Sequence, residues 1–354
     1  PSYGSDNIFA AGQQQWKERR TLLSPFFDTR HVLVDSTHNA ITQKVTQHLD
    51  RWQSSSEPVD LAKEMPKLTL DSALGHMFSV HLSDAELGQA VELFQASGRA
   101  VGDRLIGRNE SASPDLEPGL EKLAVRLLQG RQSTAQLQSQ GLAIPDDMMQ
   151  VLVDRFGDSP QELRKEVLSL ALLGHETTAN LINWTLAELE QHPAVLQSMR
   201  QEVDQVVGQQ GPPSLETVRE LKSPRLNLSE TWRLHPPNNL MLREALKDLD
   251  LDDGQGGKVH IARGTQVMMP LSVVNQESVL DGELWQPERG GSKVFSFGGG
   301  QRVCMGQVFA RHEAAVILTE MVRRFDFQSV NPNLTPHTGF AGRGRRLDGY
   351  RTPL

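Results

Sequence analysis

One stretch of this sequence, residues 297–306 (FGGGQRVCMG), combines a reactive side chain with an unusual backbone. It holds Cys304, the single cysteine of 354 residues, which therefore has no partner for an internal disulfide and is too few for a structural zinc site. The glycines at 298–300 let the backbone approach a flat, bulky group without a Cβ in the way. Arg302 adds a fixed positive charge, and a helix expected to open at residues 305–306 would stabilise a thiolate. The pattern predicts a ligand-binding thiolate; the alternative is a structural cysteine buried on a glycine-rich turn.

A second stretch, residues 162–190, carries apolar residues on every side of the helix that it predicts, so this helix is expected to be buried. Its middle reads Gly174, His175, Glu176, Thr177, Thr178. A carboxylate and two hydroxyls inside such a helix are costly unless they are used or paired. The alternative use for the Thr177 hydroxyl is a bond to its own helix carbonyl four residues earlier. His175 is expected on the back of the helix.

The cysteine stretch resembles the haem-binding loop of the cytochrome P-450 superfamily, F-x-x-G-x-R-x-C-x-G. Every named position is filled, by Phe297, Gly300, Arg302, Cys304 and Gly306. The resemblance implies that Cys304 is the thiolate ligand of the iron of haem b, and that the other four residues bind the cofactor. A thiolate ligand pushes electron density to the iron and favours O–O cleavage.

Residues 174–178 resemble the family's oxygen-activation motif, G-x-E-T-T. By that resemblance Gly174 makes room for dioxygen over the iron, Thr177 donates a hydrogen bond during oxygen activation, and Glu176 relays protons to it. Heterolytic O–O cleavage needs two protons and a site that water does not flood, which suits these residue types.

Two further motifs resemble structural parts of the same family. Trp16 and Arg20 are four residues apart and share a helix face, like the family's W-x-x-x-R, which implies contacts to a haem propionate. Glu230 and Arg233, with Arg289 downstream, resemble the Glu-Arg-Arg triad, a buried ion network that holds the cysteine loop.

The pocket around the haem is assigned more loosely. Residues 237–243 are expected to pass over the haem, with Arg243 as a further propionate partner. The residues expected to line a substrate pocket are Leu173, Asn239, Leu240, Met241 and Phe340. The leucine, alanine and methionine residues expected to wall the iron face favour a small to medium lipophilic substrate.

The chain departs from the family at two places. Residues 275–277 read Asn-Gln-Glu where a His/Arg-Asp-Pro run is common, and Arg289 is followed by glycine with only seven residues before Phe297. These departures imply a shortened loop on the cysteine side of the haem. They put the surface that would bind a redox partner in doubt more than the chemistry at the iron.

The elements that must position these motifs are mostly helices. Periodic apolar residues predict helices at 13–23, through 26–158 with a loop at 111–119, and at 307–323. Alternation predicts short strands at 259–274, and a final hairpin is expected after 325.

The resemblance implies a mainly α fold with small β-sheets, an α+β triangular prism with the haem between the central long helix and the helix after the cysteine loop. One domain is expected over residues 1–354, helix-rich at about 1–235 and 305–324 and β-rich at about 238–274 and 325–354.

Composition limits the setting. The net charge of −8, with signs well mixed, argues against nucleic acid as a partner, and a lone cysteine fits a reducing cytoplasm. No uncharged apolar run reaches the 18 or more residues of a membrane span, and no signal peptide is visible. The chain opens abruptly, so the family's N-terminal segment is expected to be missing and a membrane anchor there stays open. The sequence is interpreted as a monomer of the soluble, bacterial-like type.

These features together predict a haem-thiolate monooxygenase that uses O₂ and takes electrons from NAD(P)H through a separate ferredoxin or flavodoxin. Two alternatives stay open. A peroxide-dependent or rearranging haem-thiolate enzyme would need no electron supply and has less use for the Glu176–Thr177 pair. A haem-binding or sensing protein would coordinate haem without turnover.

Overall fold

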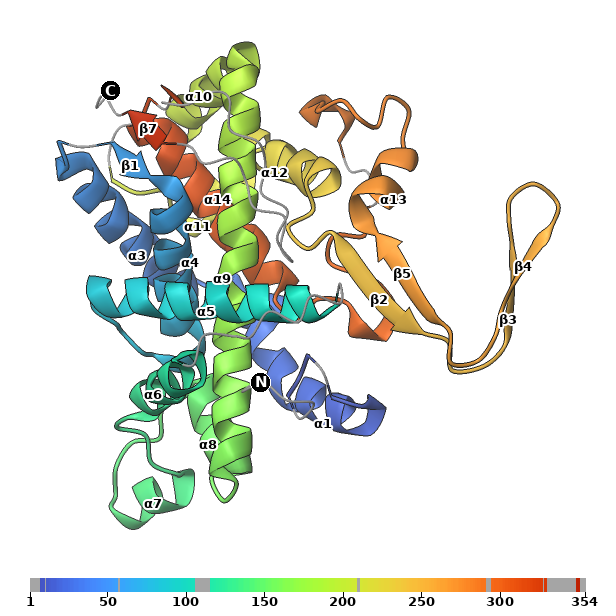
Figure 1. The fold of residues 1–354 in the computed structure, drawn as a ribbon. Coiled ribbons are helices and arrows are strands. Elements are labelled where there is room, and N and C mark those ends of the chain that lie inside the picture. The colour runs from blue at the N-terminus through green and yellow to red at the C-terminus, as the bar shows by residue number, and fades with distance from the viewer. Residues whose placement is uncertain are drawn as a thin grey trace.

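The computed structural model describes residues 7–9, 11–56, 58–105, 115–208, 211–290, 294–326, 328–329 and 348–350. Within these ranges the chain is mainly helical, with small antiparallel sheets at its periphery (Figure 1). The predicted fold class, mainly α with small β-sheets, is therefore confirmed.

The helices, in chain order, are α1 (Gln13–Leu23), η1 (Ser24–Phe27), α2 (Thr29–Val32), α3 (Asp35–Ser54), α4 (Leu61–Phe78), α5 (Asp84–Leu105), α6 (Leu116–Leu128), α7 (Thr134–Ser139), α8 (Met148–Phe156), α9 (Pro160–Gln191), α10 (Pro193–Val207), α11 (Leu215–Glu220), α12 (Ser223–Leu234), α13 (Leu271–Glu277), η2 (Pro287–Arg289), η3 (Gly300–Arg302) and α14 (Gln307–Arg324). The strands are β1 (Val59–Asp60), β2 (Leu240–Glu244), β3 (Leu249–Asp252), β4 (Lys258–Ile261), β5 (Gln266–Pro270), β6 (Gln328–Ser329) and β7 (Asp348–Tyr350).

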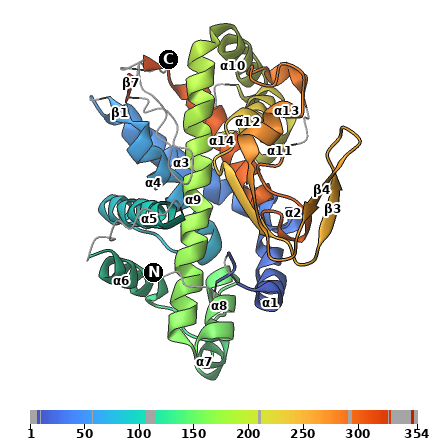
Figure 2. The same ribbon diagram turned by 45° about the vertical axis from the view of Figure 1, so that its right-hand side comes forward.

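The 32-residue helix α9 is the central helix of the molecule, and it runs most of the height of the helical body in both Figure 1 and Figure 2. Pro160 opens it, where a missing N–H costs nothing. Pro193 follows its end and starts α10. Helices α4, α6, α8, α12 and α14 pack around it, which is why its apolar residues extend to every face. The predicted buried helix at 162–190 is confirmed.

Helix α4 crosses α9 at Gly174. A Cβ built on Gly174 would lie 3.2 Å from Met77 Cε and 3.3 Å from Ala73 Cβ, both on α4. Next to it, the Thr69 hydroxyl of α4 donates a hydrogen bond to the His175 carbonyl at 3.0 Å. The crossing is therefore too close for any residue with a side chain to fit without movement.

The sheets are short and antiparallel. Strand β2 pairs with β5, with Leu240 opposite Pro270, and β3 pairs with β4 in a hairpin that projects from the body (Figures 1 and 2). A third sheet has the order β1-β7-β6, in which β6 and β7 pair antiparallel as the expected final hairpin requires.

Two expected boundaries were wrong. The loop expected at 111–119 ends earlier than predicted, because α6 begins at Leu116 and accommodates Pro118 in its first turn; residues 111–114 lie outside the described ranges. The strands expected up to residue 274 end at Pro270, and α13 follows. Its buried residues, Leu271 and Asn275, are four apart, so the helical face that they form outweighs the strand preference of the two valines between them.

The core also holds an acidic side chain that lacks a cationic partner among the described residues. Glu313 of α14 is fully buried, and within the same ranges neither of its carboxylate oxygens has a hydrogen bond of good geometry. Burial raises the pKa of Glu313 to about 8, and the hydroxyls of Ser72 and Thr178 only partly offset that effect. The carboxyl is therefore neutral at pH 7 in the folded protein.

Among the described residues, no helix combines the length and the apolar composition needed to cross a membrane.

The Glu313 carboxyl predicts a pH-dependent stability. Its folded-state pKa lies above the unfolded value of about 4.5, so the folded state binds the extra proton and the free energy of unfolding falls as pH rises from 4.5 to 8. Glu313→Gln removes this dependence. The stability difference between Glu313→Gln and the parent protein, measured by urea unfolding, is expected to grow by more than about 1.4 kcal/mol between pH 5 and pH 8. A constant difference across that range contradicts a neutral Glu313.

The close crossing at Gly174 predicts a cost for any side chain there. Gly174→Ala is expected to lower the free energy of unfolding by about 1 kcal/mol, because the flexible Met77 side chain absorbs part of the overlap. A Cβ added at Gly98 on α5 would meet no described atom within 4 Å, so the matched Gly98→Ala variant is expected to gain about 0.5–1 kcal/mol. Equal effects of the two substitutions in chemical unfolding would overturn the packing role of Gly174.

Candidate active site

The Cys304 loop is a tight turn that closes on itself. The Cys304 N–H donates to the Phe297 carbonyl at 2.8 Å, and the Gly298 N–H donates to the Phe295 carbonyl at 2.7 Å. Gly298 and Gly300 have φ values of +75° and +69°, a backbone region that residues with a Cβ rarely adopt. These two glycines let the loop turn back so that Cys304 lies exposed at its end.

Helix α1 docks against this loop through the side chains that the sequence placed on one face. Arg20 donates to the Val303 carbonyl at 2.6 Å. In return, Arg302 donates to the Ala11 carbonyl at 2.9 Å and its guanidinium lies 4.8 Å from the centre of the Trp16 ring. The structure therefore brings Trp16, Arg20 and Arg302 together beside Cys304.

Three arginines near the loop have no acidic partner in the part of the chain that the structure describes. Burial, and then the charge of nearby Arg243, lower the pKa of Arg302. Arg243 itself donates to the carbonyl of its neighbour Leu242. Among the described residues, no carboxylate lies within ion-pair distance of Arg20, Arg243 or Arg302. Clustered cations of this kind suit an anionic ligand, and above all one with carboxylates, which guanidinium groups bind well.

The Cys304 residue is exposed at the surface, but the protein atoms packed around its sulfur desolvate the thiol and raise its pKa. The Gly306 N–H and the charge of Arg20 offset that rise only in part. Helix α14 begins at Gln307, as the helix expected at 307–323 requires, so residues 305–306 precede it. Gly306 is its N-cap, and the Gly306 N–H points at the sulfur from the helix start. A metal cation at the sulfur would complete its deprotonation.

The middle of α9 has an open stretch on an otherwise buried helix. Leu173 is 39% exposed, and Gly174, Glu176 and Thr177 are half-buried. Leu173 and Thr177 are four residues apart and share one face. Among the described residues the Thr177 hydroxyl makes no hydrogen bond, whereas Thr185 further along donates to the Leu181 carbonyl at 2.9 Å. Thr177 therefore does not bond back to its helix, and its hydroxyl is available for other contacts.

Two neighbours of Thr177 on α9 have different roles. His175 is fully buried, its Nδ1 donates to the Ala171 carbonyl at 2.9 Å, and burial lowers its pKa to about 4. It is a neutral core residue on the back of the helix. Gly174 was expected to make room over an iron, but the space left by its missing side chain is filled by α4. The structure gives Gly174 a packing role instead.

The Glu-Arg-Arg set is a buried network. Arg233, which is fully buried, donates to both oxygens of Glu230 at 2.9 and 2.8 Å, and Arg289 approaches Glu230 at 3.3 Å. The same carboxylate accepts the Gln286 N–H at 2.9 Å. The network ties α12 to the segment that leads into the Cys304 loop.

Asn275 also supports the loop, and the sequence reasoning gave it no role. It is fully buried; its amide donates to Ser296 Oγ at 3.1 Å and its amide oxygen accepts the Phe295 N–H at 2.9 Å. A signal for it existed, since Asn275 opens the stretch that departs from the family pattern.

The expected substrate-pocket residues have mixed outcomes. Leu240 and Met241 are half-buried on β2, and Met241 Cε lies 3.4 Å from the Cβ position of Gly298, so it packs on the Cys304 loop. Asn239 is exposed, but its side-chain oxygen accepts the Ser272 N–H at 2.7 Å and so caps the start of α13. Phe340 lies outside the described residues.

This donor set fits a haem. The Cys304 sulfur is a soft anionic ligand for iron, the glycine backbone leaves room for a flat ring, and Arg20, Arg243 and Arg302 provide the positive charge that two propionates require. The fit rests on the chemistry of these residues and on arginines that no described carboxylate neutralises.

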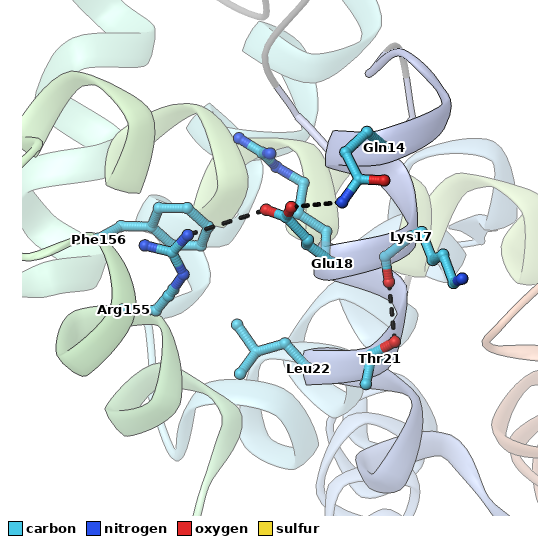
Figure 3. A pocket seen from close by; sticks show the side chains of 8 residues that line it. Gln14, Lys17, Glu18, Thr21, Leu22, Arg155 and Phe156 are labelled. Carbon is cyan, nitrogen blue, oxygen red and sulfur yellow. Dashed lines mark hydrogen bonds and ion pairs between the residues drawn. The ribbon is translucent and has the colours of Figure 1, made fainter.

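A separate pocket of about 610 Å³ lies between α1 and α8 (Figure 3). It is lined by Gln14, Lys17, Glu18, Arg19, Thr21, Leu22, Arg155 and Phe156. By helical spacing these α1 residues lie on another face from Trp16 and Arg20. The pocket is therefore not part of the Cys304 site.

Comparison with known proteins finds a family model, described as Cytochrome P450, that matches residues 1–343. Similar proteins include a cytokinin hydroxylase from Arabidopsis thaliana, 27% identical over 90% of this chain and 66% of its own length. An 11-oxo-beta-amyrin 30-oxidase from Glycyrrhiza uralensis is 26% identical over 89% of this chain and 65% of its own. Cytochrome P450 734A6 from Oryza sativa subsp. japonica is 30% identical over 89% and 65%. The chain spans about two thirds of the length of these curated relatives.

The buried ion network predicts a large effect of Glu230→Ala. Removing the carboxylate leaves Arg233 buried without its partner, so the free energy of unfolding is expected to fall by about 3–5 kcal/mol and little haem-loaded protein to form. Glu18→Ala removes a more exposed carboxylate that lies 3.9 Å from Arg155, and this control is expected to cost less than about 1 kcal/mol. Urea unfolding and haem content per protein check both variants. Normal haem incorporation by Glu230→Ala would show that the network is not needed to hold the Cys304 loop.

Proposed function

Because this chain belongs to the cytochrome P450 family, as its motifs predicted, we propose that the protein is a haem-thiolate monooxygenase. It inserts one atom of O₂ into a lipophilic small molecule. The observation that carries the proposal is the exposed Cys304 thiol beside three arginines that lack carboxylate partners among the described residues. An iron porphyrin with two propionates supplies the metal and the negative charges that this arrangement calls for.

The chain's own residues first hold the cofactor. Cys304 would bind the iron, and the charge of Arg20 and the Gly306 N–H favour its thiolate form against the burial that raises its pKa. Arg20 and Arg302 also tie the loop to α1 through the Val303 and Ala11 carbonyls. When bound, the haem supplies the oxygen chemistry, which thiolate ligation favours.

Helix α9 supplies the residues that transfer protons and exclude water. The unused Thr177 hydroxyl donates a hydrogen bond into the site, and the half-buried Glu176 next to it passes protons between solvent and that hydroxyl. Leu173, exposed on the same face as Thr177, keeps water out and offers an apolar surface to the substrate. Gly174 lets α4 approach α9 and so fixes the position of this face.

The apolar residues assigned to the substrate pocket favour a lipophilic substrate. Leu173, Leu240 and Met241 carry no charge and no hydrogen-bonding groups, so they bind by burial of apolar surface. The similar proteins include one named as a hydroxylase and one named as an oxidase. Those names support oxygen insertion as the reaction class, and the molecules that they mention belong to those proteins.

The remaining parts of the proposal concern the setting. Electrons come from NAD(P)H through a separate ferredoxin or flavodoxin. We place the protein in the cytoplasm, because a lone cysteine fits a reducing compartment, and we propose that it acts as a monomer.

The test compares Thr177→Val with Thr177→Ser in the full-length protein. The valine variant keeps the shape and loses the hydroxyl, so product formed per NAD(P)H consumed is expected to fall by about 10²-fold. The serine variant keeps the hydroxyl and is expected to retain most of the coupling. Equal coupling in the two variants contradicts the role of Thr177.

The same material separates the alternative functions. Product that depends on NAD(P)H and a redox partner supports the monooxygenase. Product with peroxide alone would indicate a peroxide-using enzyme, and a thiolate-type CO spectrum without any product would indicate a haem-binding protein. Cys304→Ser is expected to lose that spectrum, and its persistence would refute Cys304 as the ligand.

A further inference from the structure

Arg311 of α14 lies against a pair of neighbouring aromatic rings, one of which belongs to the Cys304 loop. Its guanidinium carbon is 4.8 Å from the centre of the Trp232 ring and 4.8 Å from the centre of the Phe297 ring. The two rings are 4.9 Å apart and inclined at 56°. Trp232 belongs to α12 and Phe297 begins the loop, so one cation joins three separate elements.

This guanidinium has no acidic partner within the described ranges. Among the described residues it forms no ion pair, and its buried Nε has no hydrogen bond. Burial accordingly lowers the pKa of Arg311. A desolvated cation without a carboxylate is costly, and the two ring faces are what stabilise it here. A planar guanidinium stacks on such faces better than a lysine ammonium does.

The ring that Arg311 holds belongs to the residue that closes the loop. The Phe297 carbonyl accepts the Cys304 N–H at 2.8 Å. On the other side, Ser296, the residue before Phe297, donates its hydroxyl to the Trp232 carbonyl. The Phe297 backbone is thus fixed by Trp232 through Ser296, and its ring is fixed by Trp232 and Arg311 together.

We propose that Arg311 is a positioning residue for Cys304. By holding the Phe297 ring against Trp232, it fixes the Phe297 carbonyl, and the carbonyl fixes the direction of the Cys304 N–H and hence of the sulfur. This inference rests on the proposed function in one respect, that the sulfur is the haem ligand. Arg311 acts through Phe297, whereas Arg20 is the arginine whose charge favours the thiolate.

The first measurement uses the haem-free full-length protein, so it does not depend on the cofactor. Hydrogen exchange is followed at the Cys304 amide in the parent, Arg311→Met and Arg311→Lys. The methionine keeps the length of the side chain and removes the cation, so exchange is expected to be about tenfold faster. The lysine keeps the charge without the flat fork and is expected to fall between the two.

A control separates this effect from the general cost of losing an arginine. Arg225 of α12 is exposed, and its Nε donates to the Leu221 carbonyl of the preceding turn. Arg225→Met is expected to leave exchange at Cys304 unchanged. If Arg311→Met fails to fold, Phe297→Leu removes the ring and leaves the cation, and the same rise in exchange is expected.

The second measurement follows the haem-loaded proteins by the thiolate-type CO spectrum and the reduction potential. Arg311→Met is expected to lose at least half of the thiolate-type signal and to shift the potential, with partial recovery in Arg311→Lys. If Arg311→Met leaves the spectrum, the reduction potential and the amide exchange unaltered and lowers only the unfolding midpoint, Arg311 contributes to stability alone. That result would overturn the inference. A parent protein without any thiolate-type spectrum would instead defeat the proposed function, and the exchange result would still decide whether Arg311 orders the loop.

Discussion

The hydrogen bond from the Cys304 N–H to the Phe297 carbonyl is the contact on which the candidate site depends. It closes a loop that has no regular secondary structure apart from one short turn, so the position of the sulfur is set by what holds the two ends of that bond. Arg20 holds the Cys304 side through the neighbouring Val303 carbonyl. Trp232, Asn275 and Arg311 hold the Phe297 side. The loop is therefore positioned from α1, α12, α13 and α14, and a helical body surrounds a site that the loop alone would not order.

The side chains around the Cys304 loop carry an excess of positive charge. Arginines 20, 243 and 302 gather without a carboxylate from the described residues, while the Glu230 network, which ties α12 to the segment before the loop, pairs its charges fully. Buried structural charges are usually paired because an unpaired one is costly. The Glu230 network is therefore part of the scaffold, because its charges balance one another. The three arginines instead mark a binding site, because their counter-charge must come from a ligand.

The central helix combines two requirements that conflict. Its burial against the neighbouring helices demands apolar residues and close crossings, which Gly174 and the neutral His175 satisfy. The chemistry proposed for it uses a carboxylate and a hydroxyl, which Glu176 and Thr177 carry on a stretch that the neighbouring helices cover less completely. One turn of helix therefore carries packing residues and reactive residues side by side, separated only by the direction in which each side chain points.

The sequence by itself determined the family, the mainly helical fold, the buried course of α9 and the members of the Cys304 loop, because these depend on local patterns of residue type and spacing. Contacts between distant segments were decided only by the tertiary structure. The role of Gly174 against α4, the helix α13 in place of a strand end, the use of Asn239 as a cap and the stacking of Arg311 on Phe297 all depend on which element lies opposite. The type of a residue limits which contacts its side chain can make. Its neighbours in space decide which of those contacts form, and the local sequence does not specify those neighbours.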